Sequence, residues 1–208
     1  MEISGLFLGL GNPGSSYANT RHNAGFMAVD TLLDACEKTG DIIPLSGSKK
    51  KFEAWKCRIP PNSPKAEAVW IVAKPLTFMN KSGEAALALL QFYKIPLSRL
   101  VVAHDEVDLP LGGMRFKFGG GDAGHNGIRS LVECTGSRDF YRLRLGIGKP
   151  LRGDVAPFVL ERFSGQEMPY LAEILPAAIT GFFLFCSEGL AKAQNSINSF
   201  SLAPCPHG

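Results

Sequence analysis

Three side chains with complementary chemistry lie at the ends of two apolar runs. Asn12 and His22 follow the apolar run at 6–10, and Asp105 follows a second run at 100–104. A neutral imidazole can take a proton from water at physiological pH, and a carboxylate would fix its tautomer and stabilise the imidazolium. An asparagine amide can donate a hydrogen bond to a developing oxyanion without a competing charge. These residue types favour hydrolysis by an activated water.

Each of these residues also has an ordinary structural interpretation. Asn12 precedes a Pro-Gly pair, which suits the central positions of a type II turn. His22 could lie on the surface, and Asp105 could simply end a strand. Three further asparagines precede predicted helices as potential N-caps: Asn23, Asn80 and Asn126. The catalytic interpretation is favoured because these segments share one predicted edge of a sheet, where ligands bind in open α/β folds.

A glycine-rich motif points to a different chemistry. Gly9, Gly11 and Gly14 satisfy the Gly-x-Gly-x-x-Gly pattern of dinucleotide-binding folds, and Asp30 lies near the expected ribose-binding acid. The next helix is predicted to begin near Asn23, too late for its amino end to hold a pyrophosphate. A nucleotide-dependent oxidoreductase is therefore the weaker interpretation.

Metal and covalent chemistry are also weakly supported. The acidic segment 104–108, with His22 and His125, has the residue types of a metal site. Neighbouring residues of a strand point to opposite faces, so few oxygens of this segment are expected to converge on one ion. The sequence has no Gly-x-Ser-x-Gly nucleophile motif, and no cysteine lies in an electropositive turn. We expect neither a metal nor another cofactor.

Alternating strands and helices predict an α/β fold that positions these residues. Strands are expected at 6–10, 52–59, 68–73, 100–104, 116–118 and 141–147, and helices at 23–40, 81–94, from 126, and over 167–200. The second and third strands read as a hairpin, which favours a mixed sheet surrounded by helices. We expect one domain over 1–202 and a disordered tail over 203–208.

Composition limits the class of protein. A chain of 208 residues with 45% hydrophobic and 20% charged residues can bury one full core. Five scattered cysteines without a Cys-x-x-Cys pair predict reduced thiols and a cytoplasmic protein. The first residues do not read as a secretory signal. The apolar stretch 174–186 is broken by Pro176 and Gly181 and predicts a core helix, with no membrane partner.

Positive charge is small in total and uneven along the chain. The net charge of +3 does not by itself establish a polyanionic partner. Cations gather at 49–58 and again at 115–152, where Arg142 and Arg144 are expected on the polar face of a strand. Such clusters can follow phosphates, or they can be ordinary solvated charges.

Taken together, these blocks resemble the bacterial-type peptidyl-tRNA hydrolases. The matching segments are GLGNPG at 9–14, TRHN at 20–23, KPLTFMN at 74–80, HDEVDLP at 104–110, GHNG at 124–127 and RLRLGIG at 142–148. The similarity extends over nearly the whole chain. It implies a monomeric, single-domain enzyme without a cofactor, whose substrate is peptidyl-tRNA. The implied reaction hydrolyses the ester between the peptide and the terminal adenosine of the tRNA.

The resemblance also assigns roles to individual residues. His22 corresponds to the catalytic base, Asp105 to its carboxylate partner, and Asn12 to the residue that distinguishes blocked peptidyl-tRNA from free aminoacyl-tRNA. The implied substrate-binding residues are Tyr17, Phe78, Met79, Asn80 and Asn126, with Lys117 and Arg144 near the tRNA acceptor arm.

Two positions depart from the family pattern. Ala123 replaces a glycine that many relatives have, and Pro157 follows the segment that resembles a mobile lid. The principal alternative to the enzyme is a non-catalytic tRNA- or ribosome-binding module that has kept the fold.

Overall fold

The computed structural model describes the chain apart from residues 1, 40, 46–50, 60–67, 151 and 203–208. The predicted disordered tail at 203–208 and the turn of the predicted hairpin lie outside the described residues.

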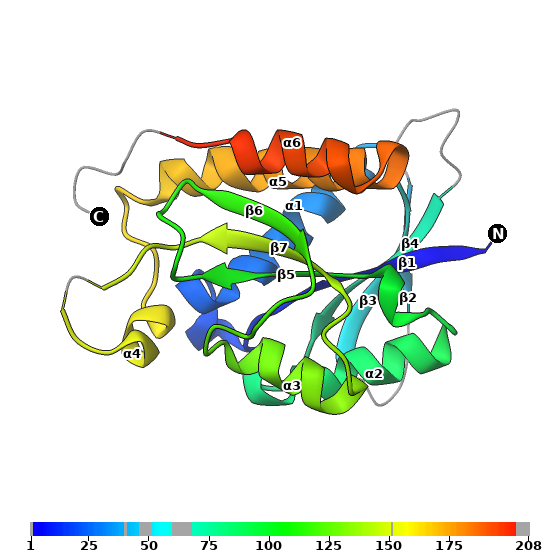
Figure 1. The fold of residues 1–208 in the computed structure, drawn as a ribbon, viewed down its shortest axis with the longest axis horizontal. Coiled ribbons are helices and arrows are strands. Elements are labelled where there is room, and N and C mark those ends of the chain that lie inside the picture. The colour runs from blue at the N-terminus through cyan, green and yellow to red at the C-terminus, as the bar shows by residue number, and fades with distance from the viewer. Residues whose placement is uncertain (1, 40, 46–50, 60–67, 151, 203–208) are drawn as a thin grey trace.

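One mixed sheet of seven strands forms the centre of the fold (Figure 1). The strands are β1 (Ile3–Gly9), β2 (Ile42–Leu45), β3 (Phe52–Ile59), β4 (Ala68–Pro75), β5 (Leu100–Glu106), β6 (Met114–Phe118) and β7 (Tyr141–Gly146). Their order is β2-β3-β4-β1-β5-β7-β6. β1 pairs in parallel with β4 and β5, and β5 with β7, whereas the β2–β3, β3–β4 and β6–β7 pairs are antiparallel. The predicted mixed sheet and the β3–β4 pairing are confirmed.

Helices cover both faces of this sheet (Figure 1). They are α1 (Ala24–Glu37), α2 (Ser82–Phe92), α3 (Asn126–Thr135), α4 (Val155–Leu160), α5 (Met168–Glu188) and α6 (Leu190–Ser199). α1, α5 and α6 lie on one face, and α2 and α3 on the other. Successive side chains of β1 point to opposite faces of the sheet, which explains the two layers. Phe7 packs into the core on the side of α1, α5 and α6, and Leu6 and Leu8 pack into the core on the side of α2 and α3.

The apolar helix α5 belongs to the core that it shares with α1 and α6. By length and composition alone it is a candidate membrane span. Seven of its residues are nevertheless buried against the protein, and the Phe182 ring lies 4.5 Å from Phe7 and 5.0 Å from Trp70. This packing agrees with the prediction of a core helix.

The structure corrects the interpretation of the first loop. Gly14 has a φ of 102° as expected, but its ψ of 152° is far from the value near 0° of a type II turn. α1 begins at Ala24, which agrees with the argument against a pyrophosphate site. Gly9 and Gly25 instead let β1 and α1 approach closely, since a Cβ on Gly9 would collide with the carbonyl oxygen of Gly25.

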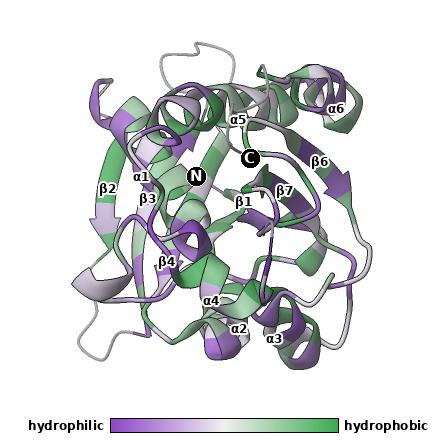
Figure 2. Cartoon of the chain, turned by 90° about the vertical axis from the view of Figure 1, so that its left-hand side faces the viewer, coloured by the Kyte–Doolittle hydropathy of each residue, from purple (hydrophilic) through white to green (hydrophobic). Residues whose placement is uncertain are grey.

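Two short elements were not predicted from the sequence. β2 contains Pro44, and two of its four residues are exposed and the other two half-buried, so it lacks a buried-strand pattern. α4 has only six residues, all apolar, with Pro157 in its first turn, where the missing N–H costs least. Its apolar residues, drawn green in Figure 2, hide any amphipathic period.

Candidate active site

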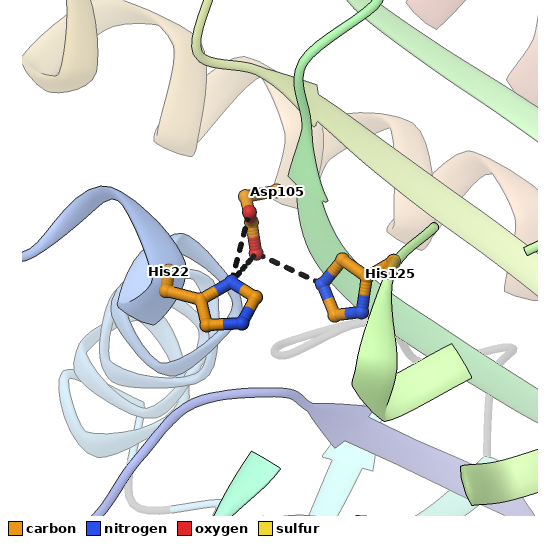
Figure 3. A group of neighbouring side chains, drawn as sticks. All are labelled: His22, Asp105 and His125. Atoms are coloured by element: carbon orange, nitrogen blue, oxygen red, sulfur yellow. Dashed lines mark hydrogen bonds and ion pairs between the residues drawn. The ribbon is translucent and has the colours of Figure 1, made fainter. Parts of the chain in front are cut away.

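Three side chains from distant segments meet at the carboxyl end of β5 (Figure 3). His22 lies on the short 3₁₀ turn η2 (Arg21–Asn23), Asp105 on β5, and His125 immediately before α3. The Nδ1 atom of His22 lies 3.0 Å from both carboxylate oxygens of Asp105, and the Nε2 atom of His125 lies 3.0 Å from Oδ1. Asp105 is therefore held between two imidazoles.

Backbone contacts fix the tautomer of His125. Its Nδ1 accepts hydrogen bonds from the backbone N–H groups of Gly127 and Ile128, at 3.1 and 3.3 Å. A nitrogen that accepts carries no proton, so the proton of the neutral ring is on Nε2 and is donated to Asp105. His125, and not Asn126, is thus the N-cap of α3, which corrects the predicted cap.

The arrangement leaves one nitrogen of His22 as an acceptor. With Asp105 ionised, the Nδ1 of His22 donates to it, and the Nε2 of the neutral ring keeps its lone pair. Burial alone would raise the pKa of Asp105, but the electrostatic attraction and hydrogen bonds of His125 and His22 hold that pKa well below its usual range. Asp105 can therefore orient His22 as a carboxylate at physiological pH.

The same three residues have the composition of a metal site. The potential ligand atoms of His22, Asp105 and His125 lie within 4.8 Å of one another. Among the described residues, Asp105 is the one carboxylate of the acidic segment in this group, which agrees with the expectation that few of its oxygens converge. The two histidines can join Asp105 because they come from other segments, and the alternation of side chains along one strand does not restrict them. A metal on Nε2 of His125 would require the proton on Nδ1, facing two N–H donors. The hydrogen bonds thus favour a proton-linked triad.

The side chain of Asn12 is also held in one orientation. Its Oδ1 accepts the backbone N–H of Met79 at 2.8 Å, which leaves the Nδ2 group as a donor. Asn23 forms two hydrogen bonds with the backbone of Asn12, as acceptor at 2.8 Å and as donor at 3.0 Å. The side chain of Asn23 was predicted to cap α1, but it makes no capping hydrogen bond and instead fixes the Asn12 loop.

The remaining predicted substrate residues lie on neighbouring elements. Phe78 is exposed, and its ring meets that of Tyr17 edge-on at 6.3 Å. Met79 is buried at the start of the 3₁₀ turn η3 (Met79–Lys81), which also carries Asn80 and packs against α3. Asn80 and Asn126 are exposed, and Asn80 lies within its turn and does not precede it as a cap.

Cations on β6 and β7 form a second group. Lys117 pairs in register with Arg142, and Arg115 with Arg144. Arg142 is buried and donates to the carbonyl oxygens of Gly120 and Gly121, so the strand face predicted to be polar is covered at this residue. The Nε of Arg144 donates to the buried Glu106 at 2.7 Å, and within the part of the chain that the structure describes its terminal nitrogens have no hydrogen-bond partner. Burial and the neighbouring Arg144 and Arg142 lower the pKa of Lys117.

Comparison with known proteins identifies the family. The family model for peptidyl-tRNA hydrolase matches residues 6–204. The chain belongs to the peptidyl-tRNA hydrolase family. It is 50% identical over 203 residues to the peptidyl-tRNA hydrolase of Nitratidesulfovibrio vulgaris strain Miyazaki F, covering 96% of this chain and 98% of that protein. The enzyme of Oleidesulfovibrio alaskensis is 48% identical over 201 residues, with 96% and 98% covered.

Solved structures agree with the family assignment. The crystal structure of peptidyl-tRNA hydrolase from Acinetobacter baumannii superposes with a TM-score of 0.85 at 34% identity, covering 98% of this chain and all of that one. The predicted resemblance and fold class are confirmed, and the chain is an enzyme of the peptidyl-tRNA hydrolase family.

Several residues of this peptidyl-tRNA hydrolase support the site through contacts that its sequence does not reveal. The sequence predicts His125 as a candidate metal ligand and part of a matching block, and Asn23 as a helix cap within another matching block. It predicts Glu106 as part of the acidic segment. Their positions in the blocks GHNG, TRHN and HDEVDLP were the available signal, but the contacts depend on tertiary structure.

Proposed function

We propose that this member of the peptidyl-tRNA hydrolase family cleaves the ester between peptide and tRNA by general-base catalysis, with His22 as the base. The observation that supports this is the hydrogen bond from Nδ1 of His22 to Asp105, which leaves Nε2 as a proton acceptor. A base with its tautomer fixed in this way suits water activation, because the carboxylate also stabilises the imidazolium that forms.

The reaction proceeds through a tetrahedral intermediate. Nε2 of His22 takes a proton from water as the oxygen attacks the ester carbonyl carbon. The carbonyl oxygen becomes an oxyanion, to which the Nδ2 group of Asn12 is the available donor. The bond to the ribose oxygen then breaks, and the proton on His22 passes to that oxygen. The products are a tRNA with an intact terminal hydroxyl and a peptide carboxylic acid, which loses its proton to solvent and leaves as the carboxylate.

The aromatic and amide residues are proposed to hold the end of the substrate. Phe78 is exposed beside Tyr17, so either a base or an apolar part of the peptide can pack on it. Stacking of a base on an aromatic ring contributes about 1 to 3 kcal/mol. Asn80, Asn126 and the Met79 segment supply the adjoining polar and apolar contacts.

Lys117 and Arg144 are proposed to contact phosphates of the tRNA acceptor arm. They lie on adjacent strands with the buried Arg142, while Glu106 fixes Arg144 through a single nitrogen. Phosphate contacts give affinity without reading sequence, which suits an enzyme that accepts many tRNAs. A local cluster of this kind is compatible with the net charge of only +3. We further expect a monomer that acts in the cytoplasm.

Release of tRNA from an N-acetylated aminoacyl-tRNA tests this proposal. The purified protein should cleave the acetylated substrate and spare the unblocked form. A chelator that prefers transition metals over Mg²⁺ should leave the rate unchanged, because tRNA keeps its Mg²⁺ and the triad needs no metal. Tight tRNA binding without turnover would instead indicate a binding module, and a loss of activity with the chelator would indicate a metal enzyme.

A further inference from the structure

The turn that carries His22 is anchored in three directions by three consecutive side chains. Arg21, His22 and Asn23 are all buried. His22 contacts Asp105 on β5, and Asn23 contacts the loop after β1. Arg21 points to a third part of the chain, the corner between α4 and α5, which the proposed reaction does not use.

The guanidinium of Arg21 makes several contacts at this corner. Its Nη2 donates to both carboxylate oxygens of Glu167, at 3.1 and 3.0 Å, and its Nη1 lies 3.2 Å from Glu161. The Phe158 and Phe163 rings lie 4.3 and 5.7 Å from its central carbon. An arginine held by ion pairs and aromatic faces at once has little freedom to move.

Glu167 is the better fixed of the two acidic partners. The side chain of Glu167 is 17% exposed, whereas that of Glu161 is 64% exposed. Glu167 also forms a reciprocal capping arrangement with Ser164, accepting its backbone N–H at 2.7 Å and donating its own to the Ser164 hydroxyl at 3.3 Å. Arg21 is thus tied to the amino end of α5, a 21-residue helix of the core.

Backbone hydrogen bonds join the same two segments, the one before His22 and the one between α4 and α5. The N–H of Arg21 donates to the carbonyl of Glu161 at 2.9 Å, and the N–H of Phe163 donates to that of Asn19 at 3.1 Å. These bonds align the segment before His22 with the segment before α5. A shift at the α4–α5 corner would therefore be transmitted to the imidazole one residue away.

We propose that Arg21, paired with Glu167, is a positioning residue that keeps Nδ1 of His22 in register with Asp105. The inference rests on the proposed role of His22. Arg21 and Glu167 also line a cavity of about 900 Å³ together with residues 147–150 and 152–154 of the loop between β7 and α4. Displacement of a reacting group by about 1 Å can cost about 100-fold in rate, so a small rotation of this turn would matter.

Kinetics of three variants test the positioning role. Arg21→Gln and Glu167→Gln should lower kcat by about 10- to 100-fold, with KM changed less than about threefold. Arg21→Lys should recover part of kcat, since it keeps the charge but not the planar fork. Arg99→Gln is the matched control, because Arg99 forms an exposed pair with Glu2 at 3.6 Å at the amino end of β1. An unchanged kcat in both Arg21→Gln and Glu167→Gln would overturn the inference.

Proton NMR of histidine-labelled protein separates positioning from simple stability. The Nδ1 proton of His22, hydrogen-bonded to Asp105, should exchange faster with water in Arg21→Gln. The Nε2 proton of His125 should keep its protection. Equal loss of protection at both rings would indicate a purely structural role. This readout needs no substrate, so it stands even if His22→Ala remained active and the proposed catalytic function failed. Glu167→Gln provides the same measurement if Arg21→Gln does not fold.

Discussion

At the scale of single residues, the site depends on which nitrogen carries each proton. The backbone of α3 makes Nδ1 of His125 an acceptor, so Nε2 donates to Asp105. Asp105 then accepts from two rings and remains ionised. His22 is left with a free lone pair on Nε2. His125 thereby helps to fix the proton positions around Asp105.

Asn12 provides a prediction at this scale. Asn12→Asp keeps the oxygen that accepts the Met79 N–H but removes the Nδ2 donor. If that donor stabilises the oxyanion, kcat should fall by about 100- to 1000-fold, as for other oxyanion donors. Steady-state cleavage of N-acetylated aminoacyl-tRNA measures the effect.

The control for this change is Asn19→Asp at an exposed position. It adds the same charge in the same loop region, and its rate should stay within about twofold of wild type if only the donor matters. A comparable loss in both variants would mean that charge, and not the lost donor, slows the reaction.

At the scale of elements, close packing of α1 against the sheet positions the turn before it. Gly25 lies against the backbone of Leu10 and Ala103, so a methyl group there would meet the Ala103 carbonyl oxygen. Because η2 leads directly into α1, this contact also sets the height of His22 above β5. Gly9 and Gly25 thus serve the close packing of α1 against β1 and β5.

Gly25→Ala tests this packing. The substitution should lower the free energy of unfolding by about 1 to 3 kcal/mol, because neither backbone neighbour can move freely. Urea unfolding followed by circular dichroism measures it. Gly165→Ala is the matched control, since a Cβ there has no atom within 4 Å and should change stability by less than about 0.5 kcal/mol. Equal stability of the two variants would show that the α1 contact is not tight.

At the scale of the whole molecule, a buried histidine links folding to pH. Burial and the neighbouring His125 hold the pKa of His104 well below its usual value of 6.5. Its Nδ1 donates to the carbonyl of Asp105 at 2.8 Å. Below about pH 6.5 the unfolded chain gains a proton at His104 that the native state excludes, so the free energy of unfolding decreases as the pH is lowered.

His104→Asn isolates this contribution. The amide can retain the donor to the Asp105 carbonyl but does not titrate. Wild type should lose up to about 1.4 kcal/mol more stability per pH unit than the variant between pH 6 and 5. Denaturant unfolding across this range gives both slopes. Parallel slopes would mean that His104 takes up its proton equally in both states.

Much of the molecule follows from local sequence patterns, and the rest depends on tertiary contacts. Alternation and apolar runs predicted most strands and the longer helices, but β2 and α4 are short and lack a clear period. Asp105 and His22 could be paired because both follow predicted strands at one edge. Arg142 was expected on a polar strand face, and no local pattern reveals the 120–121 carbonyls that cover it.

The central claim is that His22 removes a proton from water, and the rate of His22→Ala on N-acetylated aminoacyl-tRNA tests it most directly. A folded variant, verified by its unfolding transition and by tRNA binding, should lose at least about 100-fold in kcat, the low end for a general base. Cleavage at the wild-type rate by that folded variant would contradict the claim.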